Sequence, residues 1–119
     1  MEIARKHSKD MSERNYFDHD SPEGCDPACR YQKNNYYCSG SVLSAENLFQ
    51  NNLYDSVTYY NGIPSYNWNT QEEIAQSTVQ GWMTSQGHRE NILYGSLTTE
   101  GIGIYIDSDD KVYITENFC

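Results

Sequence analysis

The chain has 119 residues and carries 8 Lys and Arg against 17 Asp and Glu, a formal net charge of −9 at pH 7. A chain of this length supplies one hydrophobic core, so we expect a single domain over residues 1–119. The negative charge repels a phosphate backbone and argues against nucleic acid as a partner. Apolar runs are only a few residues long, far short of the roughly 20 needed for a transmembrane segment.

The first predicted element is a helix over residues 2–15. Ile3, His7 and Met11 recur every four residues and therefore share one face of this helix. We accordingly interpret His7 as a packed histidine rather than a catalytic one. The amino-terminal residues contain neither the apolar stretch nor the small-residue cleavage site of a secretory signal.

Residues 18–41 are predicted to form a loop, because Pro, Gly and Cys interrupt any regular period there. This loop holds three of the four cysteines of the chain, which are Cys25, Cys29, Cys38 and Cys119. An even count with one cysteine at the last position favours two disulfides, in any of three connectivities. Free thiols and a zinc site are the alternatives, although the spacing lacks a paired zinc-ribbon pattern. Disulfides would indicate a secreted or cell-surface protein.

The middle of the chain contains one strong helix signal. Thr70, followed three residues later by Glu73, is a capping-box pattern, and it predicts a helix that begins near residue 71. Before it, residues 44–51 suggest a short helix. Residues 51–70, rich in Asn and Tyr, suggest an exposed loop that could stack on sugar rings or contact a partner.

The end of the chain predicts a β-hairpin. Hydrophobic residues alternate over 101–106 and again over 112–115, with a turn rich in Asp between them. Helices at the front and middle, followed by this hairpin, predict an α+β domain in which helices cover the sheet. The turn lacks the glycine and the final glutamate of a calcium loop, so it is not interpreted as one.

Four segments resemble, in the same order, those of the CAP superfamily, the cysteine-rich secretory proteins, pathogenesis-related proteins and venom allergens. The segments are HSKDMSERNYFDHDSPEG (7–24), AENL (45–48), GWMTSQGHRENIL (81–93) and GIGIYI with YITENF near the end. The resemblance implies a three-layer α/β/α sandwich around a small antiparallel sheet. It also implies a secreted, extracellular or cell-surface location. Because this chain begins later than most such domains, we expect part of the family's first helix to be missing.

The resemblance also implies a site. His19 and His88 match the family's cavity histidines and Glu46 matches one cavity carboxylate, and this set could bind zinc or another divalent cation. The alternative is that both histidines are hydrogen-bonded braces whose tautomers Glu46 holds. Gln80 stands where the family commonly has an acid, which removes one anionic ligand or base, and Asn47 and Ser85 are expected in the same cavity. Ala45 and Gln86 also depart from the pattern, with effects expected on turn stiffness.

The function expected from these residues is an extracellular binding or interaction module with a polar His and Glu cavity. Its ligand could be a glycan, a lipid or a protein. The principal rival is a metal-dependent hydrolase that uses Glu46 as general base, and a second rival is a cell-wall domain that recognises glycan. The amide at Gln80 weakens two-carboxylate chemistry. Ser85 lies near His88 but lacks the surroundings of a nucleophile.

Overall fold

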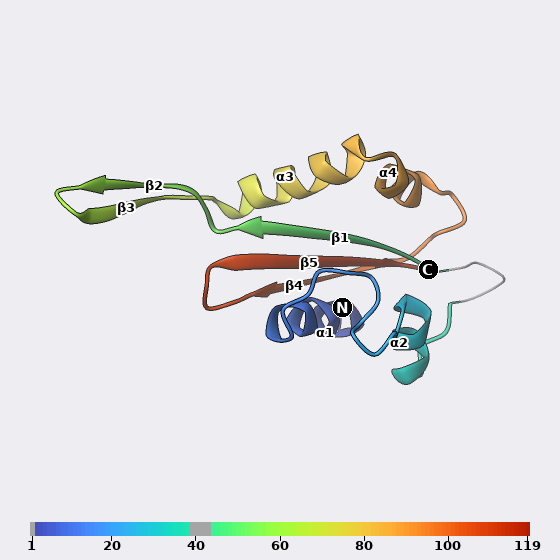
Figure 1. Cartoon of the computed structure of the whole chain (residues 1–119). Coiled ribbons are helices and arrows are strands. Elements are labelled where there is room, and N and C mark those ends of the chain that lie inside the picture. Colours follow the sequence, from blue (N-terminus) through green and yellow to red (C-terminus); the bar gives the residue numbers. More distant parts are fainter. Residues whose placement is uncertain (1, 39–43) are drawn as a thin grey trace.

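The computed structural model describes residues 2–38 and 44–119, and its elements form three layers (Figure 1). The middle layer is a three-stranded antiparallel sheet with the order β1-β5-β4. Helices α1 and α2 lie on one face of this sheet, and α3 and α4 lie on the other (Figure 1). The expected α/β/α sandwich is therefore confirmed.

The sheet consists of β1 (Ala45–Asn52), β4 (Glu100–Ile106) and the central strand β5 (Lys111–Phe118). The predicted terminal hairpin is confirmed as β4 and β5. The helix predicted over residues 44–51 is wrong, since this segment pairs with β5 from Ala45 opposite Phe118 to Asn52 opposite Lys111. Residues 46–48 are all buried because helices cover both faces of the strand, and this continuous burial hides the alternation that marks a strand.

Helix α1 (Glu2–Glu13) begins and ends close to the predicted bounds, and it buries the predicted face. Met11 packs with Leu48 and Tyr113. Ser8 donates a hydrogen bond to the Gly103 carbonyl at 2.9 Å, and its hydroxyl lies 2.7 Å from that of Thr115. These contacts hold α1 directly against β4 and β5.

The loop predicted over residues 18–41 contains the short helix α2 (Pro27–Lys33), and its residues 39–41 lie outside the described ones. Asp26 caps α2 by accepting a hydrogen bond from the Cys29 amide at 2.8 Å. The four cysteines form two disulfides, Cys25–Cys29 and Cys38–Cys119. The second one joins the loop to the end of β5, across 81 positions of sequence.

Residues 51–70 form a hairpin rather than a loop. Strands β2 (Tyr54–Tyr60) and β3 (Ile63–Trp68) pair with each other and project beyond the sandwich (Figure 1). Asn61 and Gly62, with φ of 49° and 78°, adopt the left-handed conformation of a two-residue hairpin turn. The rings of Tyr54, Tyr66 and Trp68 contact one another, with centroid separations of 5.1 to 5.7 Å.

Helix α3 (Gln71–Thr84) begins where the capping box predicted, and both reciprocal hydrogen bonds between Thr70 and Glu73 are present. Trp82 buries its indole against β5 and donates to the Leu48 carbonyl at 2.9 Å. Helix α4 (Gln86–Leu93) follows directly. None of the described helices is long and apolar enough to cross a membrane.

Candidate functional site

The centre of the site is the carboxylate of Glu46, whose side chain is 1% exposed. One oxygen accepts a hydrogen bond from His19 Nδ1 at 2.9 Å. The other accepts from Asn117 Nδ2 at 2.7 Å and from the guanidinium of Arg30. Strand β1 and central strand β5 position the two buried residues opposite each other, and α2 supplies the arginine. Both oxygens of Glu46 are therefore held by protein donors.

These partners determine which groups are charged. Burial alone would raise the pKa of Glu46, but the hydrogen bond from His19 and the charge of Arg30 lower it below its ordinary value. In turn, the hydrogen bond to Glu46 raises the pKa of His19. The ring of His19 is about half exposed. The site therefore presents a histidine with enhanced basicity to solvent, held from behind by a buried carboxylate.

His7 is buried, as the sequence predicted, and it also borders this site. Its Nε2 lies 3.0 Å from the Asp18 carbonyl and 3.8 Å from Glu46 Oε1. Burial, followed by the charge of Arg30, lowers the pKa of His7. A neutral His7 whose Nε2 carries the proton can donate to the Asp18 carbonyl and thereby fix the loop that presents His19.

His88 lies on α4, on the other face of the sheet. Side-chain amides connect its backbone carbonyl to β1, next to Glu46. Asn47 donates to the His88 carbonyl at 3.2 Å, while Asn91 donates to Asn47 Oδ1 at 2.9 Å. Burial and the charge of His19 lower the pKa of His88. Both histidines contact residues of β1, an edge strand of its sheet: His19 through Glu46 and His88 through Asn47.

The remaining residues expected in the cavity divide into two groups. Asn47 lies in the network just described, and the Ser85 hydroxyl lies 2.8 Å from His88 Nδ1. Gln80 is exposed on α3 and borders a shallow depression beside Val79 and Met83. Its carbonyl accepts a hydrogen bond from the Thr84 hydroxyl within α3, at 2.9 Å, and among the described residues its side chain makes no hydrogen bond to Glu46.

A metal ion needs several ligand side chains arranged around one point. Within residues 2–38 and 44–119, no group of three or more His, Cys, Asp or Glu side chains is arranged to hold a metal ion. The charge of Glu46 is already paired with that of Arg30. Among the described residues, His88 forms no hydrogen bond with Glu46, and its Nδ1 lies beside the Ser85 hydroxyl. His19, Glu46 and His88 therefore do not form a ready ligand set in this arrangement, and their binding of zinc or another divalent cation stays a prediction.

Sequence reasoning missed Arg30 and Asn117, the two donors that hold Glu46 together with His19. Asn117 lies in the YITENF segment, and a polar residue inside a buried strand is a signal that could have identified it. Arg30 sits in the cysteine-rich loop, where no periodicity distinguishes it. Only the fold shows that α2 points this residue toward β1.

The α/β/α sandwich, with His19 and Glu46 beside an edge strand, has the layers that the CAP resemblance implies. The model of the CAP family, described as the cysteine-rich secretory protein family, matches residues 1–118. The chain therefore belongs to the CAP family.

Two solved structures resemble this fold over 98% of the chain. One is an extracellular protein containing an SCP domain from Bacillus anthracis, with a TM-score of 0.59 and 30% identity, of which the chain covers 30%. The other is an outer surface protein of Borrelia burgdorferi, with a TM-score of 0.66, of which the chain covers 69%. Its identity is 16%, so it supports the fold alone.

Two proteins of Bacillus subtilis are similar in sequence. YkwD is 31% identical over 105 residues, and the membrane protein YlbC is 29% identical over 117 residues. The chain spans 32% of the length of YkwD and 26% of that of YlbC.

Proposed function

We propose that this CAP domain is an extracellular interaction module that recognises a polar ligand at the free edge of β1, through His19 and His88. The observation that carries the proposal is the state of Glu46, whose two oxygens are both hydrogen-bonded and whose charge is paired with Arg30. A carboxylate held in this way orients a histidine. It is poorly placed to take a proton from water.

The two histidines suit recognition because they differ in charge. The raised pKa of His19 favours its cationic form, and the lowered pKa of His88 favours its neutral form. One ring can therefore pair with an anionic or acceptor group, while the other donates and accepts as a neutral imidazole. An extracellular location is supported by the two disulfides and by the description of the similar Bacillus anthracis protein.

A binding panel and a turnover panel test this proposal together. Immobilised cell-wall glycans, lipid vesicles and peptides serve as binding probes, and peptide and ester substrates are assayed with and without zinc. We expect binding that His19→Ala and His88→Ala both weaken, while Glu90→Gln, an exposed change on α4, leaves it intact. We expect turnover well below the ordinary enzyme rate of about 1 per second.

Two results would contradict this proposal. Turnover at or above that rate, lost in both Glu46→Gln and His88→Ala and dependent on zinc, would establish the hydrolase and refute the module. Probe binding that survives both histidine substitutions would place the recognition surface elsewhere. The aromatic β2–β3 hairpin, the candidate for glycan stacking, would then be tested by Tyr59→Ala and Tyr60→Ala.

A further inference from the structure

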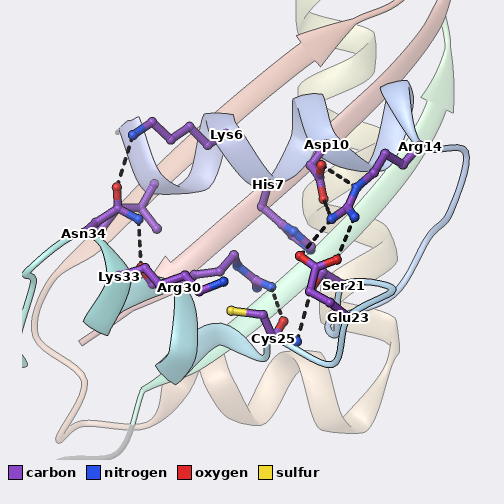
Figure 2. A pocket seen from close by; sticks show the side chains of 11 residues that line it. Lys6, His7, Asp10, Arg14, Ser21, Glu23, Cys25, Arg30, Lys33 and Asn34 are labelled. Atoms are coloured by element: carbon purple, nitrogen blue, oxygen red, sulfur yellow. Dashed lines mark hydrogen bonds and ion pairs between the residues drawn. The ribbon is translucent and has the colours of Figure 1, made fainter.

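A second pocket opens between α1 and α2, and the proposed recognition of polar ligands does not use it. Its volume is about 240 Å³. Figure 2 shows Lys6, Lys33 and Asn34 toward one end and the Asp10, Arg14 and Glu23 group toward the other, with Arg30 and His7 between them. The cysteine-rich loop forms the floor through Ser21 and Cys25.

Positive charge is concentrated here although the chain as a whole is strongly acidic. Four of the eight Lys and Arg residues line this pocket. Arg14 is neutralised locally, since it forms hydrogen bonds of 2.6 to 3.0 Å with both Asp10 and Glu23. These two are the only carboxylates among the residues that line the pocket. At this end of the pocket, the charge of Arg14 is therefore balanced by the two carboxylates and is not available to a ligand.

The other end keeps its charge available. Lys6 Nζ donates a hydrogen bond to the neutral Asn34 side chain at 3.1 Å, and no ion pair of Lys6 or Lys33 occurs among the described residues. The two lysines come from different helices, α1 and the end of α2, and both line the pocket (Figure 2). Two ammonium groups that share a pocket without a counter-ion repel each other, and an anion between them removes that repulsion.

Arg30 supplies a further donor between the two ends. Its Nη atoms are used, by the His19 and Cys25 carbonyls at 2.7 and 3.2 Å and by Glu46. Its Nε is buried and has no hydrogen-bond partner within the described part of the chain. A buried N–H without an acceptor is costly. Arg30 lines the pocket, and an acceptor oxygen bound there would satisfy this N–H once the atoms that cover Nε move aside.

We propose that the pocket between α1 and α2 binds a phosphate group, held by Lys6, Lys33 and the Nε of Arg30. A phosphate carries a charge of about −1.5 to −2 near pH 7 and three strong acceptor oxygens, which matches three donors that approach from different sides. A carboxylate offers only two oxygens. The volume of about 240 Å³ leaves room for a small substituent on the phosphate.

Titration of the ¹⁵N-labelled protein with inorganic phosphate at low ionic strength tests the site. We expect saturable shifts of the Lys6, Lys33 and Asn34 amides, with a dissociation constant of about 1 mM or tighter. The Lys6→Gln and Lys33→Gln double variant should bind at least about tenfold more weakly. Lys111→Gln, an exposed charge change on β5, should bind as the wild type does. The folded state of each variant is verified by its spectrum before titration.

Vesicles distinguish the two sources of the phosphate group. Vesicles of phosphatidylcholine with phosphatidate, compared with phosphatidylcholine alone, report a lipid headgroup, whereas free phosphate reports a soluble ligand. Binding of either probe that depends on the two lysines supports the site and identifies the source. Absence of binding to both probes would refute the proposal, as would equal weakening in Lys111→Gln, which would indicate unspecific attraction.

Discussion

Helices cover the two faces of the central sheet to very different degrees. On the face toward α1, a Cβ added to Gly103 would lie 2.0 Å from the Arg5 amide nitrogen, so helix and strand are in backbone contact. On the face toward α3, the same strand presents Ile102, Ile104 and Ile106, which remain 44 to 50% exposed. They border a groove of about 500 Å³ between α3 and the sheet.

This difference follows from side-chain size along one strand. Gly101 and Gly103 face α1, where Gly103 permits close approach, whereas the isoleucines at alternate positions face the groove beside α3. Helix α3 covers β1 and β5 through Trp82, Val112 and Ile114 but leaves β4 partly open. We therefore expect the α1 face to tolerate substitution poorly and the α3 face to tolerate it near β4.

The strongest expected effect is that of Gly103→Ala, which should cost more than about 4 kcal/mol of unfolding free energy. The new Cβ would meet the backbone of Ala4 and Arg5, which cannot yield as a flexible side chain can. Gly95→Ala is the matched control, because a Cβ at Gly95 meets nothing within 4 Å. Chemical denaturation measures both. A cost below that of an ordinary surface change would contradict the close packing of α1 on β4.

Arg30→Met should cost about 3 kcal/mol at pH 7, because it leaves the Glu46 carboxylate buried without its cation. In the wild type, the lowered pKa of Glu46 means that its stabilisation is present above its ordinary value of 4.5 and is lost as the pH falls through the folded value. The variant should therefore approach the wild type as the pH falls and Glu46 becomes protonated. Thermal melts between pH 3 and 8 measure this convergence.

Arg89→Met serves as the control for that change, since Arg89 donates to the Met83 carbonyl and is absent from the ion pairs of the described residues. A deficit for Arg30→Met that stays constant across the pH range would show that the Glu46 charge is not its cause.

Glu116→Gln should stabilise the protein at pH 8 by about 1 kcal/mol or more. Burial and a hydrogen bond to Glu100 raise the pKa of Glu116 to about 8. The folded state holds this proton where the unfolded chain has lost it, so wild-type stability falls as the pH rises from about 4.5 to 8. Glutamine can still accept the hydrogen bond from Asn47, which is 3.1 Å long.

The gain from Glu116→Gln should vanish near pH 4, where the glutamate is protonated in both states. Glu90→Gln, exposed on α4, should show no such pH dependence. A Glu116→Gln variant less stable than the wild type at pH 8 would contradict a buried, protonated Glu116.

The smallest effect is expected at Ile104. Ile104 and Ile114 lie opposite each other on β4 and β5, yet they are 50% and 4% exposed. Ile104→Ala should cost about 1 kcal/mol or less, and Ile114→Ala about 2–5 kcal/mol. Equal costs, measured by urea denaturation, would show that the open half of the α3 face is covered in solution.

The elements predicted correctly are those with local signals. The capping box at Thr70 and Glu73 fixes the start of α3, and strict alternation fixes β4 and β5. Strand β1 was missed because burial on both faces removes its alternation. The hairpin of β2 and β3 was missed although Asn61-Gly62 is a turn signal, because the flanking tyrosines suggested an exposed loop.

The site could be predicted only in part. The resemblance identified Glu46 and His19, which the structure joins by a hydrogen bond of 2.9 Å. It could not identify the cation that neutralises Glu46, because Arg30 reaches it from a helix whose position depends on tertiary packing. Glu46 is consequently an anion paired with Arg30, a state that its motif alone does not reveal.

The bond between Cys38 and Cys119 also has a mechanical consequence. Cys119 directly follows β5, the central strand, and the disulfide ties it to the chain beyond α2. A pulling force applied at the carboxyl terminus therefore passes into Cys38 instead of peeling β5 away from β1 and β4. All three strands lie within the covalent ring that this bond closes. The sheet can be unzipped from that end only after the disulfide is reduced, so in an oxidising environment the domain resists tension at its carboxyl terminus.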